Sequence, residues 1–290
     1  MNGPATLTSP LLERVRSSTT AVETDGATLL ITGTVDPRQT SHVAVSDPQQ
    51  RRFEYACSLV AWLNEPAVTT IVFCENSSTD WDFSALHAFA GAQGKTVEVL
   101  AFEGDASGAA RFGKGWGEGE IMRHALAHSA HLGGAFYKCS GRTGVQNFAD
   151  IEGLHAPDRA VFQPSPWYTT VRNLPFPLGL VRALRWKLVA QRMGARSFHP
   201  NDLVSTLFYK CDRRFWRQHL SAASRSVHDS WGYYLEHAFW NALQQATASS
   251  ANWVPFEVAP YFTGRSGSTG KLREGGDFSP EVQHLARTLL

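Results

Sequence analysis

ATLLITG, at residues 27–33, is a short apolar run that ends at a glycine, and it predicts a buried β-strand. Apolar side chains at helical spacing follow within residues 48–64. A second apolar run, TIVFC at residues 70–74, predicts a second buried strand. A strand, a helix and a strand in this order form a βαβ unit, which is typical of parallel sheets.

The same alternation continues along the chain. The pattern predicts a helix near 83–93, a strand at 96–102, a glycine-rich stretch to residue 119, a helix at about 120–131 and a strand at 135–139. Alternating strands and helices favour a parallel sheet that is covered on both faces. We therefore predict an α/β protein with a single domain, a mainly parallel central sheet and helices on both faces.

The second half of the chain is less regular, because prolines interrupt it between residues 157 and 177. Further elements are predicted as a helix at 178–193, a strand at 205–210 and a helix at 230–247. GRSGSTG at 264–270 is a loop whose small residues favour mobility or close approach to a ligand. We divide the chain into a polar leader (1–26), one α/β domain (27–271) and a C-terminal tail (272–290).

Composition places the chain among ordinary folded proteins, with 43% hydrophobic and 18% charged residues in a length of 290. A formal net charge of +1 argues against a nucleic-acid partner, because binding to phosphates generally needs a clearly basic face. The four cysteines lie far apart, without zinc-ligand spacing, which predicts buried free thiols. The sequence has no signal-peptide pattern and no apolar run of ~20 residues, so we expect a cytoplasmic protein.

Polar residues follow each predicted strand of the first half. They are Thr32-Gly33-Thr34, Glu75-Asn76-Ser77-Ser78-Thr79-Asp80, Glu103-Gly104-Asp105 and Ser140-Gly141-Arg142. In open parallel sheets, ligands bind beyond the carboxyl ends of the strands. We expect these residues to converge on one rim and to form a binding site.

Three segments resemble type A glycosyltransferases. Residues 71–80 (IVFCENSSTD) are similar to the strand ending whose acidic group contacts the nucleotide base in that family. Residues 113–120 (GKGWGEGE), before the helix expected at about 120, resemble the KGxGExE stretch of bacterial capsule and O-antigen glycosyltransferases. Residues 234–239 (YLEHAF) are similar to the acidic motif that supplies the base in inverting members. The resemblance spans about residues 27 to 271.

This resemblance implies transfer of a sugar from a nucleotide-sugar donor to a hydroxyl of a glycan or lipid-linked acceptor, in bacterial surface polysaccharide synthesis. Glu236 would be the catalytic base, with Asp229 and His237 as the nearest alternatives, and Trp231, Tyr234 and His237 would contact the acceptor. The residues implied at the nucleotide and its diphosphate are Thr32, Gly33, Thr34, Glu75, Asn76, Lys114, Gly115, Glu118, Ser140, Arg142 and Lys271.

The family's Asp-x-Asp metal motif has no counterpart at its usual place. Residues 138–142 read KCSGR, a K-x-[ST]-G-R pattern in which Ser140-Gly141-Arg142 replaces the acids. Because two carboxylates normally hold Mn²⁺ or Mg²⁺ against the diphosphate, we expect no metal ligand here and no certain cofactor. The cations of Arg142, Lys114 and Lys271 would offset the phosphate charge instead.

Two other patterns resemble metal motifs. A literal Asp-x-Asp occurs at 80–82, after the second predicted strand, and we expect it to cap a helix. His124, His128 and His131 would share one face of the expected helix, and we interpret that face as solvated.

Residues 178–196 combine leucines and valines with four arginines and a lysine. Such a segment fits the anionic inner face of a membrane, and an ordinary surface helix explains it equally well.

Two other functions stay open at this point. A sugar-nucleotide nucleotidyltransferase would carry a glycine-rich basic loop soon after the first strand, and residues 34–38 (TVDPR) lack the glycine run. A non-catalytic carbohydrate-binding relative would tolerate the missing Asp-x-Asp.

Overall fold

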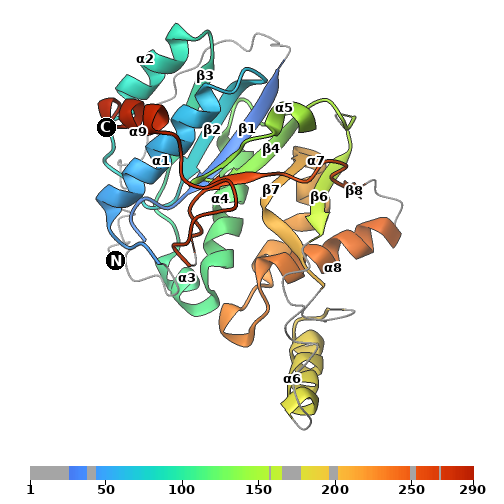
Figure 1. Ribbon diagram of the computed structural model, residues 1–290. Helices are drawn as coiled ribbons and strands as arrows, with labels where there is room; N and C mark the ends of the chain where they lie inside the picture. Colours follow the sequence, from blue (N-terminus) through green and yellow to red (C-terminus); the bar gives the residue numbers. More distant parts are fainter. Residues whose placement is uncertain are drawn as a thin grey trace, which may run out of the picture.

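The computed structural model describes residues 26–37, 44–156, 158–164, 178–195, 202–248, 253–267 and 269–290. They form an α/β protein around a seven-stranded sheet, with helices on both faces (Figure 1). This confirms the predicted fold class. The polar leader and most of the proline-interrupted connection lie outside the described residues.

The central sheet is mainly parallel and has the strand order β3-β2-β1-β4-β7-β6-β8. Only β7 runs antiparallel to its two neighbours, β4 and β6. A small second sheet pairs β5 with β9. The strands are β1 (Ala27–Gly33), β2 (Val68–Glu75), β3 (Thr96–Ala101), β4 (Ala135–Ser140), β5 (Thr143–Val145), β6 (Ala160–Pro164), β7 (Val204–Asp212), β8 (Trp253–Pro255) and β9 (Phe262–Gly264). Because β1 to β4 are parallel, their carboxyl ends share one edge of the sheet, as predicted.

Alternation of side chains along the strands divides the core into two layers. Leu29 and Ile31 of β1 pack on one face of the sheet, whereas Leu30, between them, packs on the other. All three are fully buried. The unbroken apolar sequence of β1 is therefore explained by a strand that is covered on both sides.

One face is covered by α1 (Pro48–Leu63), α2 (Ser84–Ala92) and α9 (Pro280–Thr288). Helix α1 is capped by Asp47, whose carboxylate accepts the Gln49 N–H at 3.0 Å, and it has a proline in its first turn. Helix α9 lies in the segment that the sequence assigns to a tail. It nevertheless packs on α1, with Ala286 and Leu289 in the same core.

The other face is covered mainly by α4 (Lys114–His128) and α8 (Leu235–Ala248). The predicted glycine-rich loop before a helix at about 120 is wrong, because α4 already begins at residue 114 and contains those glycines. A Cβ at Gly119 would lie 2.7 Å from the Cβ of Ser224, and one at Gly115 3.2 Å from that of Leu235. Close packing of neighbouring segments therefore offsets the low helix propensity of glycine, ~1 kcal/mol per residue.

Several shorter elements and one separate helix complete the described fold. They are α3 (Ala106–Phe112), α5 (Phe148–Ile151), α6 (Leu178–Arg192), α7 (Arg213–Phe215), the π-helix η2 (Trp216–Leu220), and the 3₁₀ turns η3 (Ala223–Arg225) and η4 (Asp229–Trp231). All four cysteines are free and buried, as predicted. No helix of the described segments is long and apolar enough to cross a bilayer.

Candidate functional site

An ion pair between a buried lysine and a partly buried glutamate lies at the carboxyl edge of the sheet, between β4 and α4. Lys138 of β4 is 1% exposed, and its ammonium contacts the carboxylate of Glu118. The same carboxylate accepts the Thr32 hydroxyl of β1 at 2.8 Å. Lys138 also donates to Ser140 Oγ at 3.0 Å and to the Thr206 carbonyl of β7 at 2.7 Å. Every proton of this buried ammonium therefore has an acceptor.

The same chain of contacts reaches Glu236, in the first turn of α8. The Thr206 carbonyl oxygen accepts a hydrogen bond from Lys138, and the Thr206 hydroxyl donates one to Glu236 Oε1 at 3.1 Å. We call Thr32, Glu118, Lys138, Thr206 and Glu236 the α4-side cluster. It connects β1, β4 and β7 with both helices on that face, so the position of the Glu236 carboxylate is fixed by the sheet.

Asp229 lies beside this cluster, at the N-terminus of α4. Its Oδ2 accepts the Lys114 N–H at 3.0 Å, so this acid lies at the positive end of the helix dipole of α4. Burial and the nearby Glu236 carboxylate raise the pKa of Asp229 to about 6, although the Lys114 ammonium opposes this shift. Its Oδ1 is buried and has no hydrogen-bond partner among the described residues. Asp229 is thus poised to exchange a proton near neutral pH.

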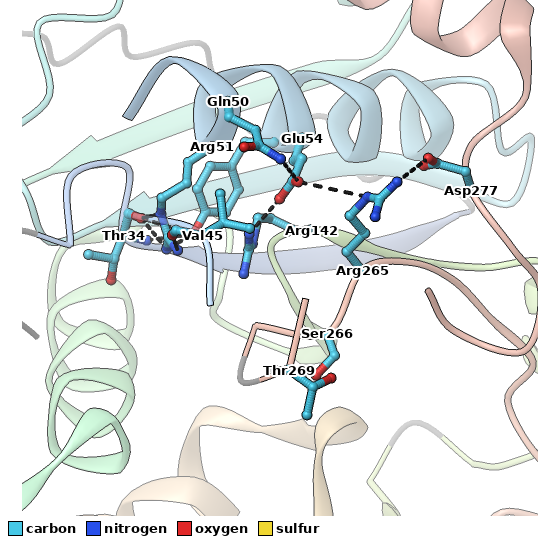
Figure 2. Close-up of polar contacts among 11 residues, drawn as sticks. Thr34, Val45, Gln50, Arg51, Glu54, Arg142, Arg265, Ser266, Thr269 and Asp277 are labelled. Carbon is cyan, nitrogen blue, oxygen red and sulfur yellow. Dashed lines mark hydrogen bonds and ion pairs between the residues drawn. The ribbon is translucent and has the colours of Figure 1, made fainter. Parts of the chain in front are cut away.

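A second set of charges lies on the α1 face of the same edge (Figure 2). Arg142, 5% exposed, pairs with Glu54 of α1. Arg265 Nε is 4.0 Å from Glu54, and its terminal nitrogen is 3.0 Å from Asp277 Oδ2. We call Glu54, Arg142, Arg265 and Asp277 the α1-side cluster, and these residues contribute to the lining of a cavity of about 210 Å³.

The loop after β9 brings further cations to this place. Its small residues allow close approach to Arg142, because a Cβ at Gly267 would lie 3.2 Å from the guanidinium. Arg273 has a buried Nε without an acceptor among the described residues, and burial lowers its pKa. Lys271 is exposed, and its backbone closes the loop through a hydrogen bond from Ser266 N to its carbonyl oxygen, 2.9 Å.

The turn after β1 is held rigidly beside Arg142. Arg51 donates to the Thr34 carbonyl at 2.7 Å and to the Val45 carbonyl at 3.1 Å (Figure 2). Tyr55 accepts the Thr34 N–H at 2.9 Å, and the Thr34 hydroxyl donates to Asn76 at 2.6 Å. The ends of β1 and β2 are therefore joined by side chains at the rim.

Two of the expected nucleotide contacts have their polar atoms engaged within the protein. Glu75 is fully buried and accepts the backbone N–H groups of Ser77, at 2.8 Å, and Thr79, at 2.9 Å. Gly33 packs against Phe73, where a Cβ would lie 2.8 Å from the ring. Both residues shape the rim, whereas Thr34 and Asn76 lie at its surface.

The expected acceptor residues differ in exposure. His237 is 2% exposed, and its Nδ1 accepts the Tyr234 N–H at 3.2 Å, at the start of α8. Tyr234 stacks on His237, with ring centroids 5.6 Å apart. Trp231 stacks on His228 at 3.9 Å and lies beside Asp229. Of the three, Trp231 and Tyr234 are only partly buried.

The structure brings together most residues expected at the rim, on two sides of it. Thr32, Glu118 and Ser140 join the α4 side, with Lys114 and Gly115 at the start of α4, while Arg142 points to α1. Sequence reasoning gave no role to Lys138, Thr206, Glu54 or Arg265. The sequence did contain a signal for Lys138. A lysine in the middle of an apolar strand is expected to be buried, and buried lysines are almost always paired with an acid.

The two metal-like patterns have structural explanations. Asp82 accepts the Ser84 N–H at 2.9 Å in a local turn just before α2, whose N-cap is Phe83, so the expected helix cap is wrong in detail. His124 stacks on Phe102 at 4.0 Å, and burial lowers its pKa to about 4. His131 lies beyond the end of α4. The described residues hold no group of three His, Cys, Asp or Glu side chains placed to bind a metal ion.

No family model and no curated protein matches this sequence. Solved structures with a similar backbone include the glycosyltransferase GlyE of Streptococcus pneumoniae (10% identity, TM-score 0.42), the bifunctional glycosyltransferase WbbM (8%, 0.43) and the galactosyltransferase LgtC, crystallised with donor and acceptor sugar analogues (9%, 0.43). The similarity to GlyE covers 81% of this chain and 46% of GlyE. For WbbM the two shares are 82% and 40%, and for LgtC they are 78% and 73%. This chain thus spans less than half of the first two. At these values the likeness carries no information about substrates.

Proposed function

We propose that this protein is a glycosyltransferase of the type A fold that moves a sugar from a nucleotide-sugar donor to a hydroxyl of a glycan or lipid-linked acceptor, in bacterial surface polysaccharide synthesis. The main support is the α4-side cluster, which joins the rim of the parallel strands to Glu236 through part-buried contacts. A carboxylate held in this way beside a nucleotide-binding rim suits a reaction that must position two substrates.

The donor would lie across the rim, between the two clusters. Thr34 and Asn76 would contact the nucleoside, and Arg142 would contact the diphosphate. Arg265 and Arg273, from the loop after β9, would share that charge with Lys114 and Lys271. A guanidinium donates to phosphate oxygens in a rigid fork, and an unpaired buried N–H such as Arg273 Nε gains most from an acceptor.

Glu236 would accept the proton of the acceptor hydroxyl as the sugar is transferred with inversion. Its Oε1 already accepts the Thr206 hydroxyl, which orients the carboxylate. Asp229, with its pKa raised to about 6, is the alternative base. Trp231 and Tyr234 offer ring faces to the acceptor sugar, a contact that aromatic side chains make well.

Charge on the departing nucleotide would be offset by these arginines and lysines, with no divalent metal. Turnover in EDTA, compared with turnover in added Mn²⁺ or Mg²⁺, tests this point. Full loss in EDTA with recovery in Mn²⁺ would contradict it.

A thermal-shift screen across UDP-, GDP-, dTDP- and CMP-sugars, followed by an assay for sugar transfer, tests the function. A ligand at 100 times its Kd stabilises by ~2.7 kcal/mol, so a true donor is readily seen. Release of nucleotide with a glycosylated product is the expected result. Formation of a nucleotide sugar from a triphosphate and a sugar 1-phosphate would identify the nucleotidyltransferase instead, and binding without turnover the non-catalytic relative.

A further inference from the structure

Helix α6 presents two leucines on its outer surface. Leu188 is 65% exposed and Leu184 54%, the highest values among the exposed large hydrophobic side chains of the described segments. They are four residues apart, so they lie on the same side of the helix. The helix already buries Val189 and Ala190, at 7% and 8% exposure. The two leucines therefore stay largely open to solvent, although they border the hollow that α6 forms with Trp231.

The charges of α6 all have one sign. Residues 178–192 contain Arg182, Arg185, Lys187 and Arg192 and no acidic residue, although the whole chain carries only +1. Arg185, Lys187 and Arg192 are exposed. Cations interspersed with outward leucines distinguish this helix from α1, which mixes both signs of charge.

This surface is continuous with the proposed acceptor side. Leu184, Leu188 and Val189 line a shallow hollow of about 440 Å³ with Arg192 and Trp231. The Arg192 guanidinium lies 4.6 Å from the centre of the Trp231 ring. Arg185 donates to the Ser230 carbonyl at 3.5 Å. Helix α6 is thus attached to the turn that carries Asp229, and it lies beyond the α8 end of the molecule (Figure 1).

We propose that α6 docks the protein on an anionic lipid bilayer. The leucines would enter the boundary between headgroups and acyl chains, while the arginines and Lys187 would contact lipid phosphates. A protein partner fits less well, because stable protein interfaces bury ~1,200–2,000 Å² around a core depleted of charge. Here the cations stand directly among the leucines. This docking goes beyond the proposed transfer reaction and does not depend on it, since lipid binding is measured without any sugar.

Vesicle flotation tests the proposal with the full chain. We expect binding to vesicles of equal parts phosphatidylcholine and phosphatidylglycerol, weakening with salt, and little binding to phosphatidylcholine alone. Lys187→Gln should weaken binding about fivefold, which corresponds to about 1 kcal/mol for one cation at an anionic surface. The double variant Leu184→Gln/Leu188→Gln, which leaves the charge unchanged, should weaken it at least about tenfold.

Matched controls come from elsewhere on the surface. Leu154, 42% exposed after α5, and Arg214, exposed in α7, are outside the docking surface, so Leu154→Gln and Arg214→Gln should bind vesicles like the parent. Equal binding to neutral and anionic vesicles, or unchanged binding of the double variant, overturns the proposal. The proposal is also overturned if light scattering shows that the parent is a dimer and that the double variant is a monomer, because the leucines would then contact a second copy of the chain.

Discussion

The two clusters at the carboxyl edge of the sheet have similar chemistry and differ in how far solvent reaches their charges. In the α4-side cluster, Lys138 is 1% exposed and its contacts come from strands and one long helix. In the α1-side cluster, Arg265 and Asp277 belong to a surface loop and are 36% and 40% exposed. Arg142 and Glu54 of the same cluster are buried, at 5% and 11% exposure, so only its loop pair of Arg265 and Asp277 is open to solvent.

This difference in exposure favours different roles for the two clusters. A buried pair stabilises one geometry, because separating its charges in a low-dielectric interior costs several kcal/mol. A partly exposed pair exchanges partners at low cost, since water screens its charges. The α4-side cluster is thus suited to positioning Glu236, and the exposed Arg265–Asp277 pair of the α1-side cluster would suit the exchange of a carboxylate for a phosphate of the proposed donor.

The largest effect is expected from removing Lys138. Lys138→Met leaves the Glu118 carboxylate, which is 24% exposed, without its cation. Because water reaches this carboxylate in part, we expect a loss of ~3 kcal/mol in the free energy of unfolding, at the lower end of the range for breaking a buried pair. Urea denaturation measures it. The double variant Lys138→Met/Glu118→Gln should recover most of the loss, and Lys95→Met, at a part-exposed lysine, should cost less than ~1 kcal/mol. A loss as small for Lys138→Met as for Lys95→Met would mean that the buried pair does not hold the edge.

The next effect concerns catalysis. Glu236→Gln retains the shape and the Thr206 hydrogen bond but removes the basic oxygen, so the transfer rate should fall at least ~100-fold. Donor affinity by calorimetry should be unchanged, because Glu236 acts on the acceptor. Turnover near the parent rate would move the role of base to Asp229.

Arg142 distinguishes a donor ligand from a structural partner. Arg142→Ala should weaken donor binding by ~1.5–3 kcal/mol, as expected for a charge-assisted hydrogen bond to phosphate. Arg52→Ala is the matched control, because Arg52 pairs with Asp80, an acid whose side chain is 86% exposed. Reduced stability with unchanged donor affinity would show that Arg142 serves only to neutralise Glu54.

The smallest effect is a pH dependence at Asp229. Its pKa is raised by burial from 3.8 to about 6, so the folded protein binds this proton more tightly than the unfolded chain. The cost of ionising it therefore develops as pH rises from ~4 to ~6 and persists above that range. Asp229→Asn should match the parent near pH 4 and exceed its stability by ~1–2 kcal/mol at pH 7.5. Urea midpoints at both pH values measure this, and a constant difference would show that ionisation of Asp229 is not its cause.

Two features of the structure could not be predicted from the sequence, one set by distant contacts and one by a local turn. Gly115 and Gly119 favour a loop by propensity, and only the approach of Leu235 and Ser224 shows why they lie in a helix. Glu75 was expected at a nucleotide base, yet its carboxylate is occupied by backbone N–H groups two and four residues on. The backbone geometry of the turn after β2 determines whether these N–H groups reach the Glu75 carboxylate, and the residue types alone do not predict that geometry.

Apolar runs such as ATLLITG determined the order of strands and helices and the α/β class, because burial on both faces of a sheet demands them. Parallel pairing then placed the ends of β1 to β4 at one edge, as the alternation predicted. Only the tertiary structure decided which charges meet. The partners Glu118 and Lys138, or Glu54 and Arg142, lie on separate elements, so no periodicity along the chain connects them. Their pairing follows from packing of helices on the sheet, where an ion without a partner would be too costly to bury.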